Sequence, residues 1–579
     1  MENPEVAQTF DEVADLLELQ GANPFRVRAY RNAARTLRDL AEPVAKIAAD
    51  PERKLEELPG IGADLAEKIR TLLQTGDLPI RRELRGQVPA GLRDLVAVPG
   101  LGPKRAQVLY QQLGIRSLDQ LRQAARQHRV RELKGFGQKT EEKILQGLNH
   151  LVPAERRVYL AEAKVYADSL TAHLRAAVGV KKICVAGSFR RRQETVGDLD
   201  ILVTCDDSGK VMDRLAAYDG VAEVLARGET KMSVRLKTGL QIDLRVVSEE
   251  SYGAALQYFT GSKAHNILLR RMAQERGLKI NEYGVFRGER RVAGRTEEEV
   301  YAAVGLPWIP PELREARGEI ELGLRGRLPR LLELKDLRGD LHMHTKATDG
   351  RASLEEMVEA ARKHGHAYVA ITDHSKRVTV AKGLDARRLR QHWKAIDELA
   401  GKVRGITVLK GVELDILEDG TLDLPDDVLA EADWVVASIH YGQSQPRAQI
   451  TRRLLNAIRN PYVHAIGHPT GRLIGKRAGY DLDLDTVLKA AADHGCLMEL
   501  NCQPSRLDLD NTALAAAKDR GIPIVLGTDA HAVEELAFME FGVYQARRAG
   551  LEAKDVANTR PLGQFRKLLA RRRPGGGCA

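Results

Sequence analysis

The segment Gly187-Ser188-Phe189-Arg190-Arg191, followed closely by Asp198-Leu199-Asp200, decides how this chain is interpreted. Val185-Ala186 is expected to end a short buried strand, and Gly187-Ser188 to turn the chain into a helix. Backbone N–H groups at a helix start, together with a serine and arginines, can hold a triphosphate. The alternative is a surface D-x-D pair beside a chance Gly-Ser turn, but the flanking elements favour a nucleotide site.

Asp198 and Asp200 are spaced to share a metal ion. A strand alternates its faces with a period of two, so both side chains point the same way. A third carboxylate is expected on a neighbouring strand, and the apolar run 241–247 supplies Asp243. Three carboxylates holding two Mg²⁺ ions are the usual apparatus of nucleotidyl transfer. The sequence therefore predicts that these three aspartates are catalytic metal ligands.

The bulk composition limits the class of protein. At 579 residues the chain is long enough for several domains, and its 43% hydrophobic and 29% charged content is typical of a soluble globular protein. A formal net charge of +10 favours a polyanionic partner without identifying it. The five cysteines form no C-x-x-C pair, and no apolar run approaches the roughly 20 residues needed to cross a bilayer. We expect a cytoplasmic monomer with no membrane partner.

Residues 1–150 read as helical and contain a repeated G-x-G turn between helices. The glycine pairs are Gly60 and Gly62, Gly100 and Gly102, and Gly135 and Gly137; Lys104 follows the second pair. One such pair is usually only a turn, but three copies look like helix–hairpin–helix motifs. Their backbone N–H groups can bind DNA phosphates without reading sequence, so affinity should fall steeply with salt.

From about Gly339 onward, apolar strands alternate with amphipathic helices, a pattern typical of a parallel β/α barrel. The predicted strands end near His344, His374, Glu413, His440, His468, Asn501 and Asp529. The active site of such a barrel lies at the strand C-termini. The candidate metal ligands there are His342, His344, Asp349, His374, Glu413, His440, His468, Asp529 and His531. Nine ligands exceed the needs of one ion, so two or three Zn²⁺ or Mn²⁺ ions are expected, activating water against a phosphorus centre.

Other histidines are expected to be structural. His364 and His366 form an H-x-H pair, but they precede the strand that begins near Ala367, which is the wrong end of the strand. His392, His464 and His494 are assigned to the same structural class.

Together these motifs resemble a bacterial family X DNA polymerase, related to DNA polymerase beta, fused to a C-terminal polymerase-and-histidinol-phosphatase (PHP) domain. The resemblance covers nearly the whole chain. It implies a multidomain fold with an all-α helix–hairpin–helix N-terminal region, an α/β nucleotidyltransferase palm and a distorted (β/α)₇ PHP barrel. The expected segments are 1–80 (helical, lyase-like), 81–150 (helix–hairpin–helix), 151–250 (palm), 251–315 (nucleotide-selecting), 316–338 (linker) and 339–575 (PHP barrel).

The resemblance also implies roles for residues around the palm. Asp198 and Asp200 would bind both Mg²⁺ ions, and Asp243 would bind the catalytic ion beside the primer 3′-hydroxyl. Ser188 and Arg191, with the turn at Gly187, would contact the incoming triphosphate.

The segment Tyr258-Phe259-Thr260-Gly261-Ser262 resembles the nucleotide-pocket motif of the family. Its two aromatic residues would crowd the sugar, so that dNTPs are preferred over ribonucleotides. By resemblance, Asn266 touches the nascent base pair, and Arg245 and Arg270 contact DNA.

Two positions depart from the family pattern. Lys263 replaces an acidic residue of the animal repair polymerase and could strengthen dNTP binding, or be a solvated lysine. Lys68 matches the Schiff-base lysine of the family's 5′-deoxyribose phosphate lyase, yet Arg26 stands where an assisting lysine is found. Lys68 could therefore be a lyase nucleophile or only a phosphate contact.

All nine PHP ligand positions carry suitable residues, so the resemblance implies an active phosphoesterase. The implied reactions are 3′–5′ exonuclease, 3′-phosphatase, 3′-phosphodiesterase or abasic-site cleavage. The leading hypothesis is a gap-filling repair polymerase that acts on gapped or primer–template DNA with dNTPs and also processes 3′ ends. The alternatives are a DNA-binding clamp with a structural barrel, and a nucleotidyltransferase acting on protein, RNA or small molecules.

Overall fold

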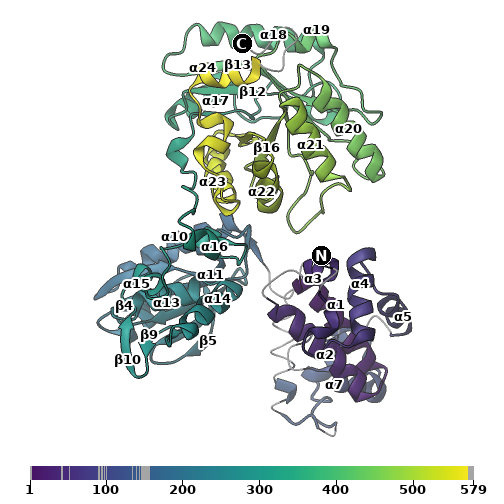
Figure 1. Cartoon of the computed structure of the whole chain (residues 1–579), viewed down its shortest axis with the longest axis vertical. Coiled ribbons are helices and arrows are strands. Elements are labelled where there is room, and N and C mark those ends of the chain that lie inside the picture. The colour runs from purple at the N-terminus through teal and green to yellow at the C-terminus, as the bar shows by residue number, and fades with distance from the viewer. Residues whose placement is uncertain are drawn as a thin grey trace. The chain divides into compact units, whose positions relative to one another are not determined.

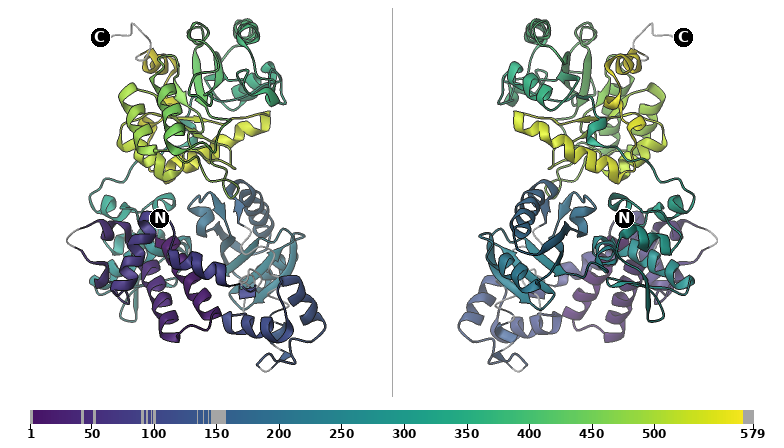
Figure 2. Two further views of the ribbon diagram at one scale, coloured as in Figure 1. Left: turned by 90° about the vertical axis from the view of Figure 1, so that its right-hand side faces the viewer. Right: turned by 90° about the vertical axis from the view of Figure 1, so that its left-hand side faces the viewer.

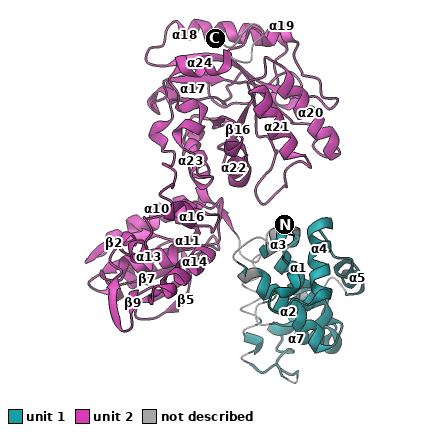
Figure 3. Ribbon diagram, viewed as in Figure 1, with its two compact units in different colours: residues 1–156 teal, residues 157–579 magenta. Residues whose placement is uncertain are grey.

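The structure is a computed structural model of the chain. It describes residues 3–570 except 41–43, 51–52, 89–91, 93–94, 97, 99–100, 134, 139, 143 and 145–156. The chain forms two compact units, Met1–Arg156 and Arg157–Ala579 (Figure 3). Each unit has hydrophobic cores of its own. Among the described residues, no helix is both long enough and apolar enough to cross a bilayer.

The first unit is helical in its described part, as the sequence predicts. Its elements are α1 (Asn3–Leu19), α2 (Pro24–Asp39), α3 (Val44–Ala49), η1 (Leu55–Glu57), α4 (Ala63–Thr75), α5 (Pro79–Gln87), α7 (Pro103–Leu113) and α8 (Leu118–Arg126). Helix α1 packs along α2, with the rings of Phe10 and Tyr30 5.6 Å apart in the core between them. Asn23 caps α2 through its side chain, and Pro24 occupies the first helical turn, where its missing N–H costs nothing.

The second unit begins with a five-stranded sheet in the order β2-β4-β7-β6-β5. The strands are β2 (Val180–Val185), β4 (Asp198–Cys205), β5 (Val221–Arg227), β6 (Lys231–Leu236) and β7 (Gln241–Val246). Smaller elements here are β1 (Val158–Tyr159), α10 (Leu160–Arg175), α11 (Gly187–Arg190), β3 (Thr195–Val196) and α12 (Ser208–Ala216). The prediction of a buried strand ending at Val185 was wrong in one respect: β2 is an edge strand and only half-buried, because it has a neighbour on one side alone.

A mixed helical and β region follows this sheet. Its elements are α13 (Tyr252–Thr260), α14 (Lys263–Glu275), β8 (Lys279–Asn281), β9 (Gly284–Arg287), β10 (Arg290–Ala293), α15 (Glu297–Ala303), η2 (Pro311–Leu313), α16 (Glu319–Leu324) and η3 (Leu334–Asp336). The segment 316–338, predicted to be a linker, contains α16 and η3. Ile320 of α16 packs in the hydrophobic core of this region. The carboxylate of Glu319 lies 2.7 Å from the buried ring of His265.

The rest of the second unit is a parallel barrel (Figures 1 and 2). Its strands are β11 (Gly339–Asp340), β12 (Tyr368–Ile371), β13 (Thr407–Asp415), β14 (Trp434–Ser438), β15 (Ala465–Ile466), β16 (Leu497–Asn501) and β17 (Ile524–Gly527). The helices are α17 (Leu354–Lys363), η4 (Thr379–Ala381), α18 (Ala386–Ala400), α19 (Asp426–Leu429), α20 (Arg447–Arg459), α21 (Leu484–His494), α22 (Asn511–Asp519), η5 (Val533–Phe538), α23 (Met539–Arg548), η6 (Ala553–Asp555), η7 (Ala557–Thr559) and α24 (Leu562–Ala570).

The seven barrel strands pair in chain order, and all neighbouring pairs are parallel. Beyond the ends of β11 and β17 the ring is nearly closed, because the N–H of His344 donates to the carbonyl of Ala530 at 2.9 Å. The N–H of Asp529 likewise donates to the carbonyl of His342 at 2.8 Å. The predicted distorted (β/α)₇ barrel is confirmed, with its ligand-bearing strand ends gathered at one mouth.

Candidate active sites

The three aspartates of the first site meet on two adjacent parallel strands. Asp200 of β4 is in register with Asp243 of β7, and Asp198 lies two residues earlier on the same strand face. Asp198 is exposed, Asp200 is half-buried and Asp243 is buried. The Ser233 hydroxyl and the Gln241 amide, the latter at 2.9 Å, both donate to the Asp243 carboxylate and fix its orientation.

The negative charge of the three aspartates favours the binding of a cation. Burial, followed by the negative charges of Asp198 and Asp243, raises the pKa of Asp200 to about 7. Carboxylate oxygens are the ligands that Mg²⁺ prefers, and a divalent ion would relieve this repulsion. The donor set therefore fits a hard divalent cation.

Gly187 lies directly against this group. Its φ of +63° is in the left-handed region, and a Cβ added there would stand 2.6 Å from Oδ2 of Asp200. The backbone N–H of Ala186 donates to the carbonyl of Asp200 at 2.7 Å. The close approach of β4 thus requires a glycine here, in addition to the positive φ of the turn.

The two arginines of the motif have carboxylate partners on later elements. The Arg190 guanidinium donates to Glu297 of α15 at 2.7 and 2.8 Å, which anchors α11. Nε of Arg191 donates to Glu315 at 2.8 Å, and its NH1 donates to the carbonyl of Thr260. Ser188 is half-buried on α11. Arg191, predicted to bind triphosphate, is therefore held by an ion pair in this structure.

The predicted nucleotide pocket adjoins the carboxylates. The rings of Tyr258 and Phe259 pack edge to face at 5.1 Å, and the guanidinium of Arg245 stacks over Phe259 at 4.2 Å. Asn266 is buried; its amide donates to the Tyr258 carbonyl at 2.8 Å, and its oxygen accepts from Gln257 at 2.7 Å. Asn266 thus holds the backbone at Tyr258.

Other predicted pocket and DNA residues lie on helix α14. Ser262 caps the helix by accepting from the N–H of His265, and Gly261 precedes it. Lys263 and Arg270 are both exposed on α14.

The described hairpins of the first unit present backbone N–H groups. Gly62 and Gly102 are the N-caps of α4 and α7, and neither helix has a side-chain cap. Gly60 and Gly135 adopt φ values of +77° and +88°, which a turn into such a helix requires. The predicted DNA contacts Gly62, Lys104 and Gly137 are exposed, and Gly100 lies outside the described residues.

The lyase candidate Lys68 lies on α4. Its Nζ forms an ion pair with Asp64, one turn earlier on the same helix. Arg26 is exposed on α2.

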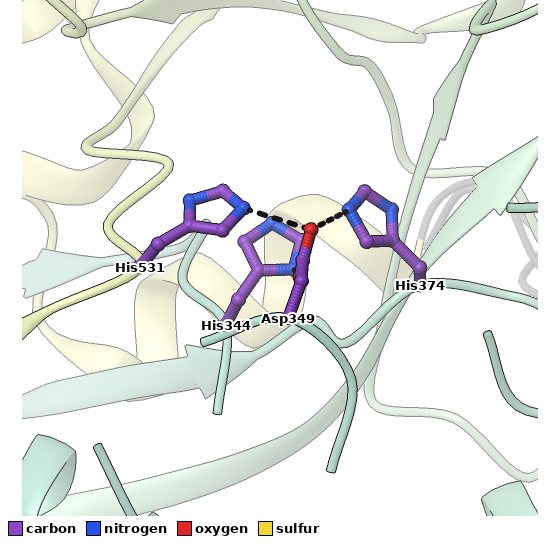
Figure 4. Close-up of side chains that lie close together, drawn as sticks. All are labelled: His344, Asp349, His374 and His531. Carbon is purple, nitrogen blue, oxygen red and sulfur yellow. Dashed lines mark ion pairs between the residues drawn. The ribbon is translucent and has the colours of Figure 1, made fainter. Parts of the chain in front are cut away.

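The barrel mouth brings the predicted ligands together in three adjoining groups. They are His344, Asp349, His374 and His531; His342, His344 and Asp529; and His374, Glu413 and His440. In the first group, Oδ2 of Asp349 lies 3.3 Å from Nε2 of His374 and 3.4 Å from Nε2 of His531 (Figure 4). His468, the ninth predicted ligand, has its Nε2 3.0 Å from Oε1 of Glu413.

Glu413 lies at the centre of the ligand groups and contacts several of their histidines. It comes from β13, is buried, and its two oxygens lie 2.8 Å from Nδ1 of His374 and 3.3 Å from Nε2 of His440. Although burial opposes ionisation, the surrounding histidines hold the pKa of Glu413 well below its usual range. Burial and the neighbouring His531 and His374 lower the pKa of His344 to about 4, so it stays in the neutral form that binds metals.

Several buried ligand atoms lie near oppositely charged groups or polar neighbours but form no hydrogen bond of good geometry among the described residues. They are His342 Nε2, both ring nitrogens of His344, His374 Nδ1, Glu413 Oε2, His440 Nδ1 and His468 Nδ1. Buried polar atoms are costly unless they are satisfied. Imidazole and carboxylate donors in this mixture suit Zn²⁺ or Mn²⁺. The mouth therefore fits a cluster of metal ions.

Two of the predicted ligands are also held in a strained backbone. His468 and Asp529 have φ values of +26° and +53°, which non-glycine residues seldom adopt. Strain of this kind gathers at functional sites because the surrounding structure must enforce it.

Comparison with known proteins accounts for nearly the whole chain. Family models match the helix-hairpin-helix domain at residues 1–78, the SAM-like helix-hairpin-helix tandem at 92–149, the DNA polymerase beta palm at 157–257, the DNA polymerase beta thumb at 255–315 and the PHP domain at 340–503. The protein named DNA polymerase/3'-5' exonuclease PolX of Bacillus subtilis (strain 168) is 41% identical over 576 residues, covering 99% of this chain and 100% of that one. This chain belongs to the bacterial family X DNA polymerases with a PHP domain.

Shorter relatives cover part of this family X polymerase. A probable phosphatase of Thermoanaerobacter sp. (strain X514) is 32% identical over 242 residues, which are 40% of this chain and 93% of that protein. A probable phosphatase of Caldanaerobacter subterraneus is 30% identical over 252 residues, or 41% of this chain and 94% of that one. The palm and PHP domains imply divalent metal ions, and the helix–hairpin–helix domains imply DNA binding.

The PHP domain of this family X polymerase also uses residues that sequence reasoning missed. Glu499 of β16 lies 2.6 Å from Nδ1 of His342 and accepts from the N–H of His468 at 2.5 Å. A signal was present: Val412-Glu413-Leu414-Asp415 recurs as Met498-Glu499-Leu500-Asn501 at the corresponding strand end. Asp373 accepts from the N–H and hydroxyl of Thr345 and so shapes the loop between His344 and Asp349.

The histidines predicted to be structural take no part in the three groups. Nε2 of His392 lies 2.9 Å from Asp373, and His464 stacks on Trp434 at 5.6 Å. His366 is buried behind α17, His364 ends that helix, and His494 lies in the last turn of α21.

A cavity of about 350 Å³ opens over the metal-ligand groups of the PHP domain. Its lining comprises Asp349, His374, Val378, Val380, Ala381, Glu413, His440, His468, Arg506, Asp529 and His531. It thus combines seven of the nine predicted ligands with an apolar wall and an arginine.

Proposed function

We propose that this chain is a DNA-directed DNA polymerase that fills short gaps in DNA repair, including base excision repair, and trims 3′ ends at a second site. The observation that carries the proposal is the presence of two separate groups of candidate metal ligands in one chain. One is the in-register Asp200–Asp243 pair of the palm, and the other is the ligand cluster of the barrel. The B. subtilis relative, whose name states both activities, is similar over its full length.

In the palm, Asp198, Asp200 and Asp243 would hold two Mg²⁺ ions. Bound there, the ions would lower the pKa of the primer 3′-hydroxyl and neutralise charge on the triphosphate. Asp243, fixed by Ser233 and Gln241, faces the primer terminus in this proposal. The backbone at Gly187 and the side chains of Ser188 and Arg191 bind the triphosphate, and Arg191 exchanges its Glu315 partner for phosphate.

Tyr258 and Phe259 would select against a 2′-hydroxyl on the sugar of the incoming nucleotide. Asn266 holds the Tyr258 carbonyl, and Arg245 stacks on Phe259, so the aromatic pair has little freedom to move away from a 2′-hydroxyl. Lys263, at the first position of α14, would add a positive charge to the dNTP site, and Arg270 would contact the template strand. These roles stay predictions.

In the PHP domain, the nine His, Asp and Glu ligands would hold two or three Zn²⁺ or Mn²⁺ ions. Such ions would supply an activated water and stabilise charge on the leaving oxygen. Glu413 and Asp349 orient the imidazoles around them, and Glu499 fixes His342 and the His468 backbone. The substrate is the 3′-terminal phosphodiester of DNA; a 3′-phosphate or an abasic site would offer the same chemistry.

The helix–hairpin–helix turns at Gly60–Gly62, Gly100–Gly102 and Gly135–Gly137, with Lys104, bind the backbone of gapped or primer–template DNA in this proposal. Lyase action by Lys68 is a further prediction. It requires Lys68 to leave its ion pair with Asp64 and to react as the free amine. A monomeric state and a cytoplasmic location also stay predictions.

Primer extension on DNA with a one-nucleotide gap tests the proposal, with Mg²⁺ or Mn²⁺ and with wild type, Asp198→Ala and His344→Ala compared. Asp198→Ala is expected to abolish extension while 3′ degradation continues, and His344→Ala to do the reverse. If one substitution removed both activities from a folded protein, two independent sites would be excluded.

A further inference from the structure

One arginine that lines the barrel cavity belongs to none of the metal-ligand groups. Arg506 follows β16 and is half-buried, and it is the one lysine or arginine among the described residues that line the cavity. Its guanidinium makes no hydrogen bond or ion pair with any described residue. A guanidinium presents paired donors that match the geometry of a phosphate. An unpaired guanidinium beside a metal-ligand cluster points to an anionic substrate group.

The backbone beside Arg506 is held under strain. Leu507 has a φ of +42°, in the left-handed region, and its side chain is only 2% exposed. That side chain is buried in the hydrophobic core of the palm, together with palm residues such as Leu170 and Val196. Palm residues, together with Phe541 of α23 in the barrel, therefore supply the packing that holds this part of the barrel mouth.

A polar connection supports the same peptide. Arg472 donates through NH2 to the carbonyl of Leu507 and, at 2.6 Å, to Oε1 of Glu194 in the palm; NH1 lies 3.3 Å from Oε2 of Glu194. The Arg472 and Glu194 side chains are only 17% and 19% exposed. Gln545 of α23 also donates to Glu194 at 2.5 Å. A bidentate ion pair of this kind, shielded from water, fixes the position of Arg472.

The same loop is tied to a metal ligand. Arg472 comes four residues after His468, and between them the hydroxyl of Thr470 donates to the buried carboxylate of Asp508 at 2.9 Å. Glu194 itself lies between the two polymerase motifs, Gly187–Arg191 and Asp198–Asp200. One palm carboxylate is thus linked through Arg472 to the loop that carries Arg506.

We propose that Arg506 binds the phosphodiester of the 3′-terminal nucleotide in the PHP cavity, and that Glu194 of the palm is a positioning residue for Arg506. This inference rests on the proposed nuclease function of the barrel. The apolar wall of the cavity, formed by Val378, Val380 and Ala381, suits the sugar and base of the same nucleotide. The barrel site therefore takes a nucleotide and depends on the palm for one of its substrate contacts.

The test uses the full chain with Mn²⁺ and the p-nitrophenyl ester of thymidine 5′-monophosphate, a phosphodiester small enough to avoid the DNA-binding domains. The variants are Arg506→Ala, Arg506→Lys, Glu194→Ala, the Arg506→Ala/Glu194→Ala double variant, and Glu312→Ala. Glu312 is the matched control because it forms a comparable ion pair with Arg547 of α23, 2.8 Å long, away from the Arg506 loop. Thermal unfolding monitors the fold of every variant.

Arg506→Ala is expected to raise KM about tenfold or more with a smaller change in kcat, and Arg506→Lys to restore part of the loss. Glu194→Ala should raise KM about fivefold, and the double variant should match Arg506→Ala alone, because both changes act on one contact. The inhibition constant of inorganic phosphate should rise in parallel. Glu312→Ala should leave KM within about twofold of wild type.

An unchanged KM in Arg506→Ala would overturn the substrate contact. Equal effects of Glu194→Ala and Glu312→Ala, or additive effects in the double variant, would overturn the positioning role. His344→Ala distinguishes failure of the proposed nuclease function from failure of this inference. If His344→Ala still hydrolysed the ester, the barrel would not be the nuclease site. If His344→Ala were inactive while Arg506→Ala was unaffected, only the role of Arg506 would be overturned.

Discussion

The carboxylate of Asp200 lies so close to Gly187 that a Cβ on the glycine would stand 2.6 Å from Oδ2 of the aspartate. The turn predicted to bind phosphate and the strand predicted to bind metal are therefore a single packed unit. Any side chain at Gly187 must push the carboxylate out of place or move the turn.

Gly187→Ala is expected to reduce gap filling about 100-fold, because misplacing a catalytic group by an ångström can cost that much. The barrel nuclease should be unaffected. Gly239→Ala is the matched control: Gly239 also has a positive φ, +90°, but a Cβ there meets nothing within 4 Å. Similar losses in both variants would assign the effect to backbone strain alone. Single-nucleotide incorporation on gapped DNA measures the difference.

Asp200 should make the metal-free palm less stable as pH rises. Its pKa is raised from 3.8 to about 7, so folding favours the protonated form; the stabilisation is complete below pH 4 and is lost as pH rises through about 7. This pKa shift sets an upper bound of about 4 kcal/mol on the free energy of unfolding that is lost between low and high pH. In EDTA, Asp200→Asn is therefore expected to raise the unfolding temperature at pH 8 more than at pH 4. The exposed Asp219→Asn should show no such difference between the two pH values.

Glu413→Gln is expected to remove at least one metal equivalent from the barrel. The carboxylate contacts His374, His440 and His468 from one central position, and a neutral amide is a poorer metal ligand. Metal content after dialysis against Mn²⁺ or Zn²⁺ measures the loss directly, without an activity assay. Glu355→Gln, on the exposed face of α17, should bind metal like the wild type. Full metal occupancy in Glu413→Gln would contradict the assignment.

Lys104→Ala should weaken binding to gapped DNA about threefold to tenfold and reduce the slope of log affinity against log salt by about one. The reason is that Lys104 is exposed beside the uncapped start of α7, where a phosphate can meet both the lysine and the backbone N–H groups. Lys335→Ala, an exposed lysine of the second unit, is the control. Titrations at several salt concentrations test this, and an unchanged slope would exclude a phosphate contact.

Periodic features were predictable because they depend on local geometry. The two-residue period of β4 places Asp198 and Asp200 on one face, and the alternation of strands and helices after Gly339 predicts the barrel and its ligand-bearing edge. Glu499 could have been found from its repeat of the Glu413 pattern. The linker prediction for 316–338 stays a prediction, but charged composition alone did not reveal that Glu319 and Ile320 have buried partners.

The sequence by itself determined the family, the chemistry of both sites and nearly all of the side chains expected to carry it, since motif spacing follows from strand and turn geometry. Only the tertiary structure decided which side chains share a partner. Arg191 pairs with Glu315, Arg472 with Glu194, and the side chain of Leu507 packs into the palm core. These contacts join positions more than a hundred residues apart, and no local pattern encodes them because they arise when separately folded surfaces meet.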